Sequence, residues 1–169
     1  MHLIIDGYNL LHAGRLLVRP DAQALQRERS RLISCLSVYR RQKLCDVTVV
    51  FDGWQGGEFI ESKERERGID LVFSKRGETA DEVIKRMVLK KGGGVIVITS
   101  DREISNFAER MAVSVIPSEQ FLERMEQTAL RPQRESSKDD DEDPGPSKKG
   151  PSKRLSKRER RKRAALKKI

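Results

Sequence analysis

The chain has 169 residues, of which 36% are hydrophobic and 36% charged, and its formal net charge is +9. This length accommodates one domain of ordinary size with a segment left over. No apolar run approaches the ~20 residues needed to cross a bilayer, and the first residues lack the pattern of a signal peptide. The two cysteines, Cys35 and Cys45, are too far apart for a CxxC redox or zinc motif. We therefore expect a soluble protein of a reducing compartment, cytoplasmic in a bacterium and plastidic only if a transit peptide is missing from this sequence.

Predicted strands and helices alternate along the first 130 residues. Near-continuous apolar runs predict strands at 2–6, 47–52, 69–74, 95–101 and 113–116. Gly7 is expected to turn the chain after the first strand, and residues 53–57 are expected to form a loop. Apolar residues at helical spacing predict helices over about 21–39, from Thr79, from about Glu103, and over 118–130. Glu82, three residues after Thr79, is expected to complete a capping box.

This alternating order predicts an α/β fold with a mainly parallel central sheet covered by helices on both faces. In such sheets, ligands bind outside the carboxyl ends of the strands. Functional side chains are therefore expected in the residues that directly follow each strand.

The composition changes after Leu130. Residues 131–169 carry 15 of the 35 Lys and Arg residues but only 7 of the 26 Asp and Glu residues, so this segment holds +8 of the net charge. It contains the acidic run 139–143, Pro/Gly/Ser-rich stretches and a basic end, and it lacks aromatic residues. We predict a folded domain over 1–130 and a disordered tail over 131–169, in which 158–166 forms a helix only on a polyanion. Such a basic tail favours nucleic acid, and the acidic run is predicted to mask it.

Four aspartates occupy corresponding positions in the predicted fold. Asp6, Asp52 and Asp101 follow strands, and Asp81 lies in the first turn of a helix. Carboxylates that meet at one edge of the sheet repel each other unless a cation neutralises them, and oxygen ligands suit Mg²⁺ or Mn²⁺. The four are our candidate catalytic and metal-binding residues. For any one of them, the alternative is a helix cap or a turn former.

Polar neighbours of these aspartates are candidate supporting residues. Asn9 is placed to orient a phosphate or a metal-bound water, or simply to shape the turn. The hydroxyls of Thr99 and Ser100 are placed to hold a carboxylate or a water, or to cap the next helix. Glu78 is a candidate for indirect support of the site.

Candidate nucleic-acid contacts come from two groups of residues. Tyr8 and Trp54 follow strand ends, where they either stack on a base or anchor a loop. Arg27 and Arg31 share one face of a helix, where they either grip phosphate or face solvent. In the tail, the candidates are Lys153, Arg154, Arg158 and Arg161.

Several short motifs occur in an order that resembles a known family. The segment Asp6–Asn9 after the opening strand resembles the start of NYN domains, which belong to the PIN-like nuclease superfamily. Four further segments follow in order: Val50–Gly53, Phe73–Ser74, Gly77–Glu82 and Thr99–Asp101. The set is similar to the YacP-like branch of NYN proteins, found in bacteria and plastids, and covers about residues 1–128.

The resemblance implies a PIN-like Rossmannoid three-layer fold and metal-dependent endoribonuclease activity. The family pattern of acidic residues falls on Asp6, Asp52, Asp81 and Asp101, with Asn9 in support. The resemblance also implies RNA as the substrate and a link to RNA processing or decay at the ribosome.

We carry two main hypotheses forward. In the first, the domain is a metal-dependent endoribonuclease, and the tail raises the local concentration of RNA. In the second, the same fold is a non-catalytic module that binds RNA or the ribosome. A third and weaker hypothesis is a nuclease that acts on DNA flaps. The sequence does not indicate an oligomeric state.

Overall fold

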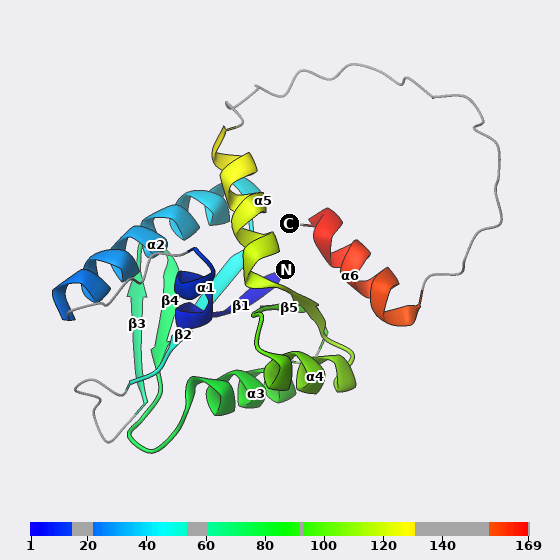
Figure 1. Ribbon diagram of the computed structural model, residues 1–169, viewed down its shortest axis with the longest axis horizontal. Helices are drawn as coiled ribbons and strands as arrows, with labels where there is room; N and C mark the ends of the chain where they lie inside the picture. The colour runs from blue at the N-terminus through cyan, green and yellow to red at the C-terminus, as the bar shows by residue number, and fades with distance from the viewer. Residues whose placement is uncertain (15–21, 54–60, 92, 131–155, 169) are drawn as a thin grey trace.

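A computed structural model describes residues 1–14, 22–53, 61–91, 93–130 and 156–168 (Figure 1). The strands are β1 (His2–Asp6), β2 (Asp46–Phe51), β3 (Ser62–Glu66), β4 (Ile69–Phe73), β5 (Val95–Ile98) and β6 (Ser114–Ile116). The helices are α1 (Gly7–Ala13), α2 (Ala22–Lys43), α3 (Ala80–Lys91), α4 (Arg102–Arg110), α5 (Ser118–Leu130) and α6 (Lys157–Lys168).

The strands form one six-stranded sheet in the order β3-β4-β2-β1-β5-β6. All neighbouring pairs are parallel except β3 with β4, so the prediction of a mainly parallel sheet is confirmed. Strands β2, β4 and β3 lie on one side of β1, and the chain then crosses over so that β5 and β6 lie on the other side. The carboxyl ends of β1 and β5 therefore flank a topological switch point, where open α/β sheets bind ligands.

Two hydrophobic clusters cover the two faces of the sheet. Leu3 and Ile5 of β1 join the cluster beneath α1, α2, α5 and α6, whereas Ile4 joins the cluster beneath α3 and α4. Side chains of a strand alternate between the faces of its sheet, so each buried strand supplies apolar groups to both clusters. This arrangement explains the continuous apolar runs in the sequence, and it gives three layers of helix, sheet and helix.

Two elements of the first 130 residues differ from the prediction. Gly7 does not turn the chain, because α1 begins at Gly7 directly after β1, and Asp6 caps this helix. The predicted turn at Gly7 is therefore wrong, and Tyr8 and Asn9 lie in a helix. Strand β3 was not predicted. Its residues are charged or polar, and it pairs antiparallel with β4 at the edge of the sheet. Charged side chains are common on edge strands because they discourage pairing with other chains.

Part of the segment predicted to be disordered is a helix. Residues 156–168 consist of Ser156 and α6, which lies beside β6 (Figure 1). Ala165 is buried, and Leu166 packs against the cluster that includes α5. The sequence predicted a helix here only on a polyanion, whereas in the structure it packs on protein. The rest of the predicted tail, 131–155, lies outside the described residues, as does the acidic run 139–143.

Within the described ranges, no helix combines the length and apolar composition that crossing a membrane requires.

Candidate active site

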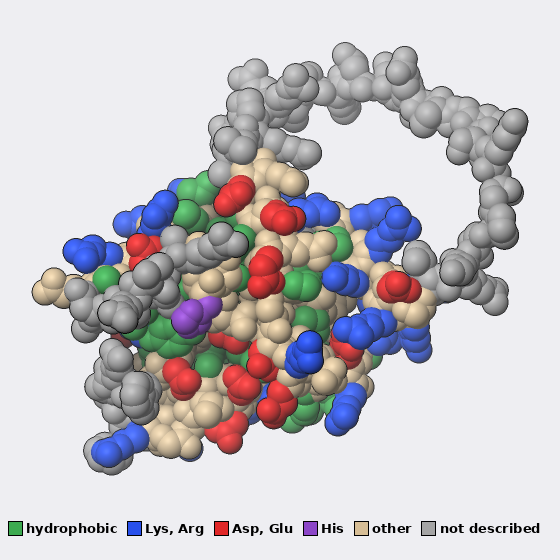
Figure 2. Space-filling model, viewed as in Figure 1, with side chains coloured by type: hydrophobic (Ala, Val, Ile, Leu, Met, Phe, Trp, Pro, Cys, Tyr) green, Lys and Arg blue, Asp and Glu red, His purple; other side chains and the backbone are tan. Residues whose placement is uncertain are grey.

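The carboxyl edge of the sheet gathers the polar residues that follow the strands. Asp6 ends β1, Asp52 follows β2, Ser74 follows β4, and Thr99 follows β5. Asp81 approaches the same edge from the first turn of α3. Figure 2 shows acidic side chains gathered between α1 and the pair α3 and α4.

Asp6 is the most buried of the four aspartates, with only 8% of its surface exposed. Its Oδ1 accepts a hydrogen bond from the backbone N–H of Asn9 at 3.1 Å, which caps α1. Its Oδ2 accepts a hydrogen bond from the Thr99 hydroxyl at 3.3 Å. The two bonds fix the carboxylate between the ends of β1 and β5.

Asp101 is the N-cap of α4. Its Oδ1 accepts hydrogen bonds from the backbone N–H groups of Glu103 at 2.7 Å and Ile104 at 3.0 Å. The backbone N–H of Asp101 donates to the Thr99 hydroxyl, which in turn donates to Asp6. Thr99 therefore links the two aspartates.

The side chain of Asn9 in α1 forms hydrogen bonds to the β5–α4 connection and to the start of α5. Its Oδ1 accepts hydrogen bonds from the backbone N–H of Ser100 at 2.8 Å and from the hydroxyl of Ser118 at 2.6 Å. The backbone N–H of Ser118 donates to the Ser100 hydroxyl at 3.0 Å. Asn9 and Ser100 thus hold α1, the β5–α4 connection and the start of α5 in register. Ser118 is fully buried, and the sequence analysis had assigned it only to the start of a helix.

Asp52 is oriented by the neighbouring strand. The Ser74 hydroxyl donates to Asp52 Oδ1 at 3.0 Å and accepts a hydrogen bond from the backbone N–H of Gly53, also at 3.0 Å. A side chain at Gly53 would collide with the backbone carbonyl of Ser74. The glycine therefore permits the close approach that holds Asp52 at the edge.

Electrostatic repulsion connects the four carboxylates. The pKa of Asp6 is raised to about 6, chiefly by burial and with smaller contributions from Asp81 and Asp101, against the opposing hydrogen bonds from Asn9 and Thr99. The pKa of Asp81 is also raised, first by burial and then by Asp101, while Lys85 opposes the shift and Asp52 adds to it. The structure thus brings together Asp6, Asp52, Asp81 and Asp101 within electrostatic range, as the sequence predicted.

The chemistry of this donor set suits a hard divalent cation. All the candidate ligands are carboxylate oxygens, and a cation would relieve the repulsion that raises the pKa values of Asp6 and Asp81. The described part of the chain contains no group of three or more acidic, His or Cys side chains close enough to chelate an ion. The described residues therefore do not form the predicted four-aspartate metal cage, whereas Mg²⁺ needs only one or two carboxylates and keeps several of its waters.

Other predicted site residues lie elsewhere. Glu78, whose side chain is only 10% exposed, forms an ion pair with Arg86, which also pairs with Glu61, so Glu78 is engaged in an ion-pair network beside α3. Arg27 and Arg31 are exposed on α2. Trp54, Lys153 and Arg154 lie outside the described residues.

Thr79 and Glu82 form the predicted capping box at the start of α3 through reciprocal hydrogen bonds of 2.9 and 3.3 Å.

Arg29 is a residue of this region that the sequence analysis missed. Its guanidinium lies over the rings of Tyr8, Phe51 and Phe73 at 5.2, 5.1 and 5.6 Å. It donates a hydrogen bond to the Tyr8 hydroxyl, and desolvation lowers its pKa. The three rings flank the ends of β1, β2 and β4, so Arg29 and Tyr8 stiffen the edge that carries Asp6 and Asp52. Tyr8 is thereby packed as an anchor.

Arg29 has a recognisable signal in the sequence. It lies between Leu25 and Leu32 at helical spacing, on the apolar face of α2. A cation at a core-facing helical position indicates a buried role for its side chain, such as stacking on aromatic rings.

The fold and its acidic edge define a PIN-like nuclease-type domain. The model of the YacP-like NYN domain matches residues 3–168, and the chain belongs to this family. The match extends through α6, beyond the segment on which the resemblance was based.

A curated relative and two solved structures are similar to this chain. "Uncharacterized protein YacP" of Bacillus subtilis is 32% identical over 85 residues, which are 50% of this chain and 49% of that protein. The chain thus aligns with about half the length of this curated relative. The crystal structure of Rae1 (YacP) from Bacillus subtilis has a TM-score of 0.62 and 25% identity, covering 76% of this chain and 75% of that one. A variant of the same protein gives a TM-score of 0.62 at 24% identity, with 76% of each chain covered, and supports the fold.

Proposed function

We propose that this protein is a metal-dependent endoribonuclease whose catalytic residues are Asp6, Asp52, Asp81 and Asp101. The observation that carries the proposal is the convergence of these carboxylates at the carboxyl edge of the sheet in a nuclease-type fold, with raised pKa values at Asp6 and Asp81. Repelling carboxylates reduce stability, and a protein retains them where function needs the charge.

One or two of the four aspartates would hold Mg²⁺ or Mn²⁺ directly, because no three of these described residues are close enough to chelate an ion together. When bound, the ion supplies activation of a water and stabilisation of the negative charge on the reacting phosphate. Asp6 and Asp101 are held by backbone and hydroxyl donors, so their remaining oxygen lone pairs are presented in fixed directions. Asn9, Thr99 and Ser100 act as positioning residues, because they contact the aspartates or the segment that carries Asp101. Hydrolysis forms a bond between the water oxygen and phosphorus and breaks a P–O bond of the RNA chain.

The test is cleavage of a mixed RNA pool by the wild type and by Asp101→Asn, in Mg²⁺, in Mn²⁺ and in EDTA. Asparagine is as good an N-cap as aspartate, so this variant keeps α4 while it removes the charge. Asp46→Asn is the matched control, because Asp46 is exposed at the opposite edge of the sheet, where β2 begins. We expect metal-dependent cutting by the wild type and the control, and a loss of at least 100-fold, on the order of one catalytic group, in Asp101→Asn.

Absence of cutting by the wild type, or full activity of Asp101→Asn, would contradict the proposal. RNA binding without cutting would instead support the binding module. The same assay with translating ribosomes tests the proposed ribosome partnership, and single-stranded DNA of matched sequence tests the choice of RNA.

A further inference from the structure

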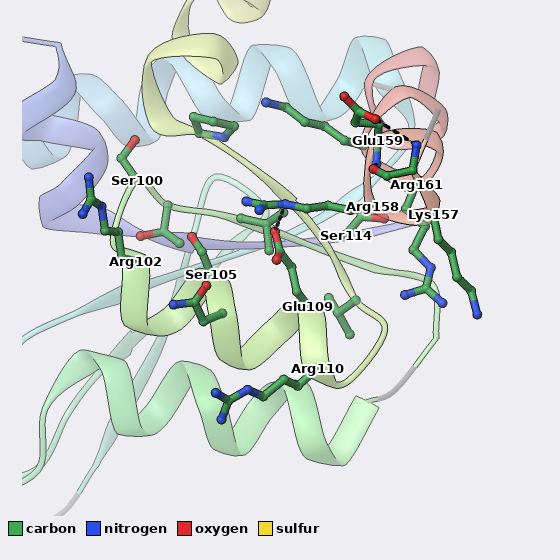
Figure 3. A pocket seen from close by; sticks show the side chains of 17 residues that line it. Ser100, Arg102, Ser105, Glu109, Arg110, Ser114, Lys157, Arg158, Glu159 and Arg161 are labelled. Atoms are coloured by element: carbon green, nitrogen blue, oxygen red, sulfur yellow. Dashed lines mark hydrogen bonds and ion pairs between the residues drawn. The ribbon is translucent and has the colours of Figure 1, made fainter. Parts of the chain in front are cut away.

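A basic cleft leads away from the acidic edge of the sheet. It has a volume of about 1090 Å³ and lies between α4 and α6, with β6 and the β5–α4 connection at its base (Figure 3). Thr99 and Ser100 line one end, and these residues contact Asp6 and Asn9 of the candidate active site. One end of the cleft is thus formed by residues that contact the candidate active site.

Cations dominate the walls of the cleft. They are contributed by α4 and α6: Arg102, Arg110, Lys157, Arg158, Arg161 and Lys162. The two carboxylates in the walls are already engaged. Glu109 pairs with Arg158 at 2.7 Å, and Glu159 accepts a hydrogen bond from the backbone N–H of Ser156 at 2.9 Å. Among the described residues, the five cations other than Arg158 have no ion-pair partner.

The docking of α6 creates this cleft. Ala165 is only 3% exposed and Leu166 packs on the core, so this end of the helix is anchored. Arg158 ties the other end to α4 through Glu109. The basic side chains are therefore held as one wall of a groove, and Figure 2 shows Lys and Arg side chains on the α6 side of the acidic region.

We propose that the α4–α6 cleft binds the sugar–phosphate backbone of the single-stranded RNA that enters or leaves the active site. This inference rests on the proposed nuclease function and specifies how its substrate is held. Carboxylates repel phosphates, so an acidic active site needs cations beside it to retain RNA. A positively charged groove that tracks the backbone is the usual solution for single strands. The residues lining the cleft include no aromatic side chain, so the cleft reads phosphates and contributes no base preference.

The test measures RNA binding in EDTA, where the proposed cleavage cannot interfere. The probe is a labelled, unstructured RNA of about ten nucleotides, within the range that single-stranded grooves cover. The cleft variant is Arg110→Gln/Lys162→Gln. The matched control is Arg41→Gln/Lys90→Gln, which removes the same charges from exposed positions on α2 and α3. Fluorescence anisotropy gives Kd between about 50 and 200 mM salt.

We expect the cleft variant to lose part of the salt dependence. Each phosphate contact to a single strand contributes about 0.7 to the slope of log K against log salt, so two lost contacts reduce the slope by about 1.4. The affinity advantage of the wild type then shrinks about sevenfold as salt rises from about 50 to 200 mM. The control should retain the wild-type slope. Equal slopes for the cleft variant and the wild type, or an equal loss in the control, would overturn the proposal.

A second pair of variants tests the cleft by adding charge. Asn106→Glu places a carboxylate in the cleft wall, and Gln26→Glu places one on the exposed face of α2. Only the first substitution should weaken RNA binding.

The outcomes distinguish the cleft proposal from the nuclease proposal. Unchanged binding with intact wild-type cleavage refutes the cleft alone, whereas cleft-dependent binding without any metal-dependent cleavage refutes the nuclease alone. A wild type that does not bind RNA refutes the cleft.

Discussion

Replacing Asp6 by asparagine should stabilise the metal-free protein above about pH 6. The pKa of Asp6 is raised from 3.8 to about 6, chiefly because the carboxylate is buried. The folded protein therefore holds this proton more tightly than the unfolded chain does, so the free energy of unfolding falls as pH rises through this window. At about 1.36 kcal/mol per tenfold change in proton affinity, the cost of the charge reaches about 3 kcal/mol above the folded pKa and is absent below pH 3.8.

Asp6→Asn isolates this effect because its amide oxygen can still accept the hydrogen bond from Asn9 that caps α1. Urea unfolding of both proteins in EDTA, between about pH 4.5 and 7, gives the difference in free energy at each pH. Over this pH range, the free energy of unfolding of the variant should rise relative to that of the wild type by most of the ~3 kcal/mol. The difference should level off above about pH 6. A difference that stays constant with pH would refute the buried-charge reasoning.

Three further substitutions test the packing around the site. Gly7→Ala should cost about 1–3 kcal/mol in unfolding free energy, because its methyl group would collide with the Phe51 ring, and thermal melts would show a lower Tm. Arg29→Lys should cost about 1–2 kcal/mol in urea unfolding, since an ammonium cannot stack as a planar guanidinium does, and wild-type stability would argue against the stacking role. Ser118→Ala should cost about 1–2 kcal/mol in the same assay by removing a hydrogen bond to Asn9, with a parallel loss of RNA cleavage if Asn9 positions the site.

The buried strands were predictable, whereas three other elements were not. Central parallel strands are buried on both faces, so β1, β2 and β5 appear as apolar runs. The edge strand β3 pairs through its backbone and leaves its charged side chains in solvent, so no apolar pattern marks it. Helix α1 has seven residues and follows β1 without a connecting loop, so it is too short to show a helical pattern of apolar residues in the sequence. Helix α6 docks through Ala165 and Leu166, too small an apolar face to distinguish it from a solvated basic tail.

The aspartates could be predicted because each follows a strand or opens a helix, and topology brings those positions together. The partners that orient them depend on packing between distant segments. Ser118 meets Asn9 across more than a hundred residues, and Arg29 reaches rings from three strand ends. Such contacts have no local pattern, although a lone arginine on an apolar helix face is a usable signal.

A capping role and the proposed site role are compatible for two of the aspartates. Asp6 caps α1 and has a raised pKa, and Asp101 caps α4 and contributes to the charge that raises the pKa values of Asp6 and Asp81. Capping uses one oxygen of each carboxylate and fixes its direction, because backbone N–H groups of a helix end do not move independently of the helix. The other oxygen of Asp6 accepts only a long bond from Thr99. In the proposed function, the same interaction that begins each helix also fixes a carboxylate for a ligand, and substituting asparagine separates the two roles because it preserves the cap and removes the charge.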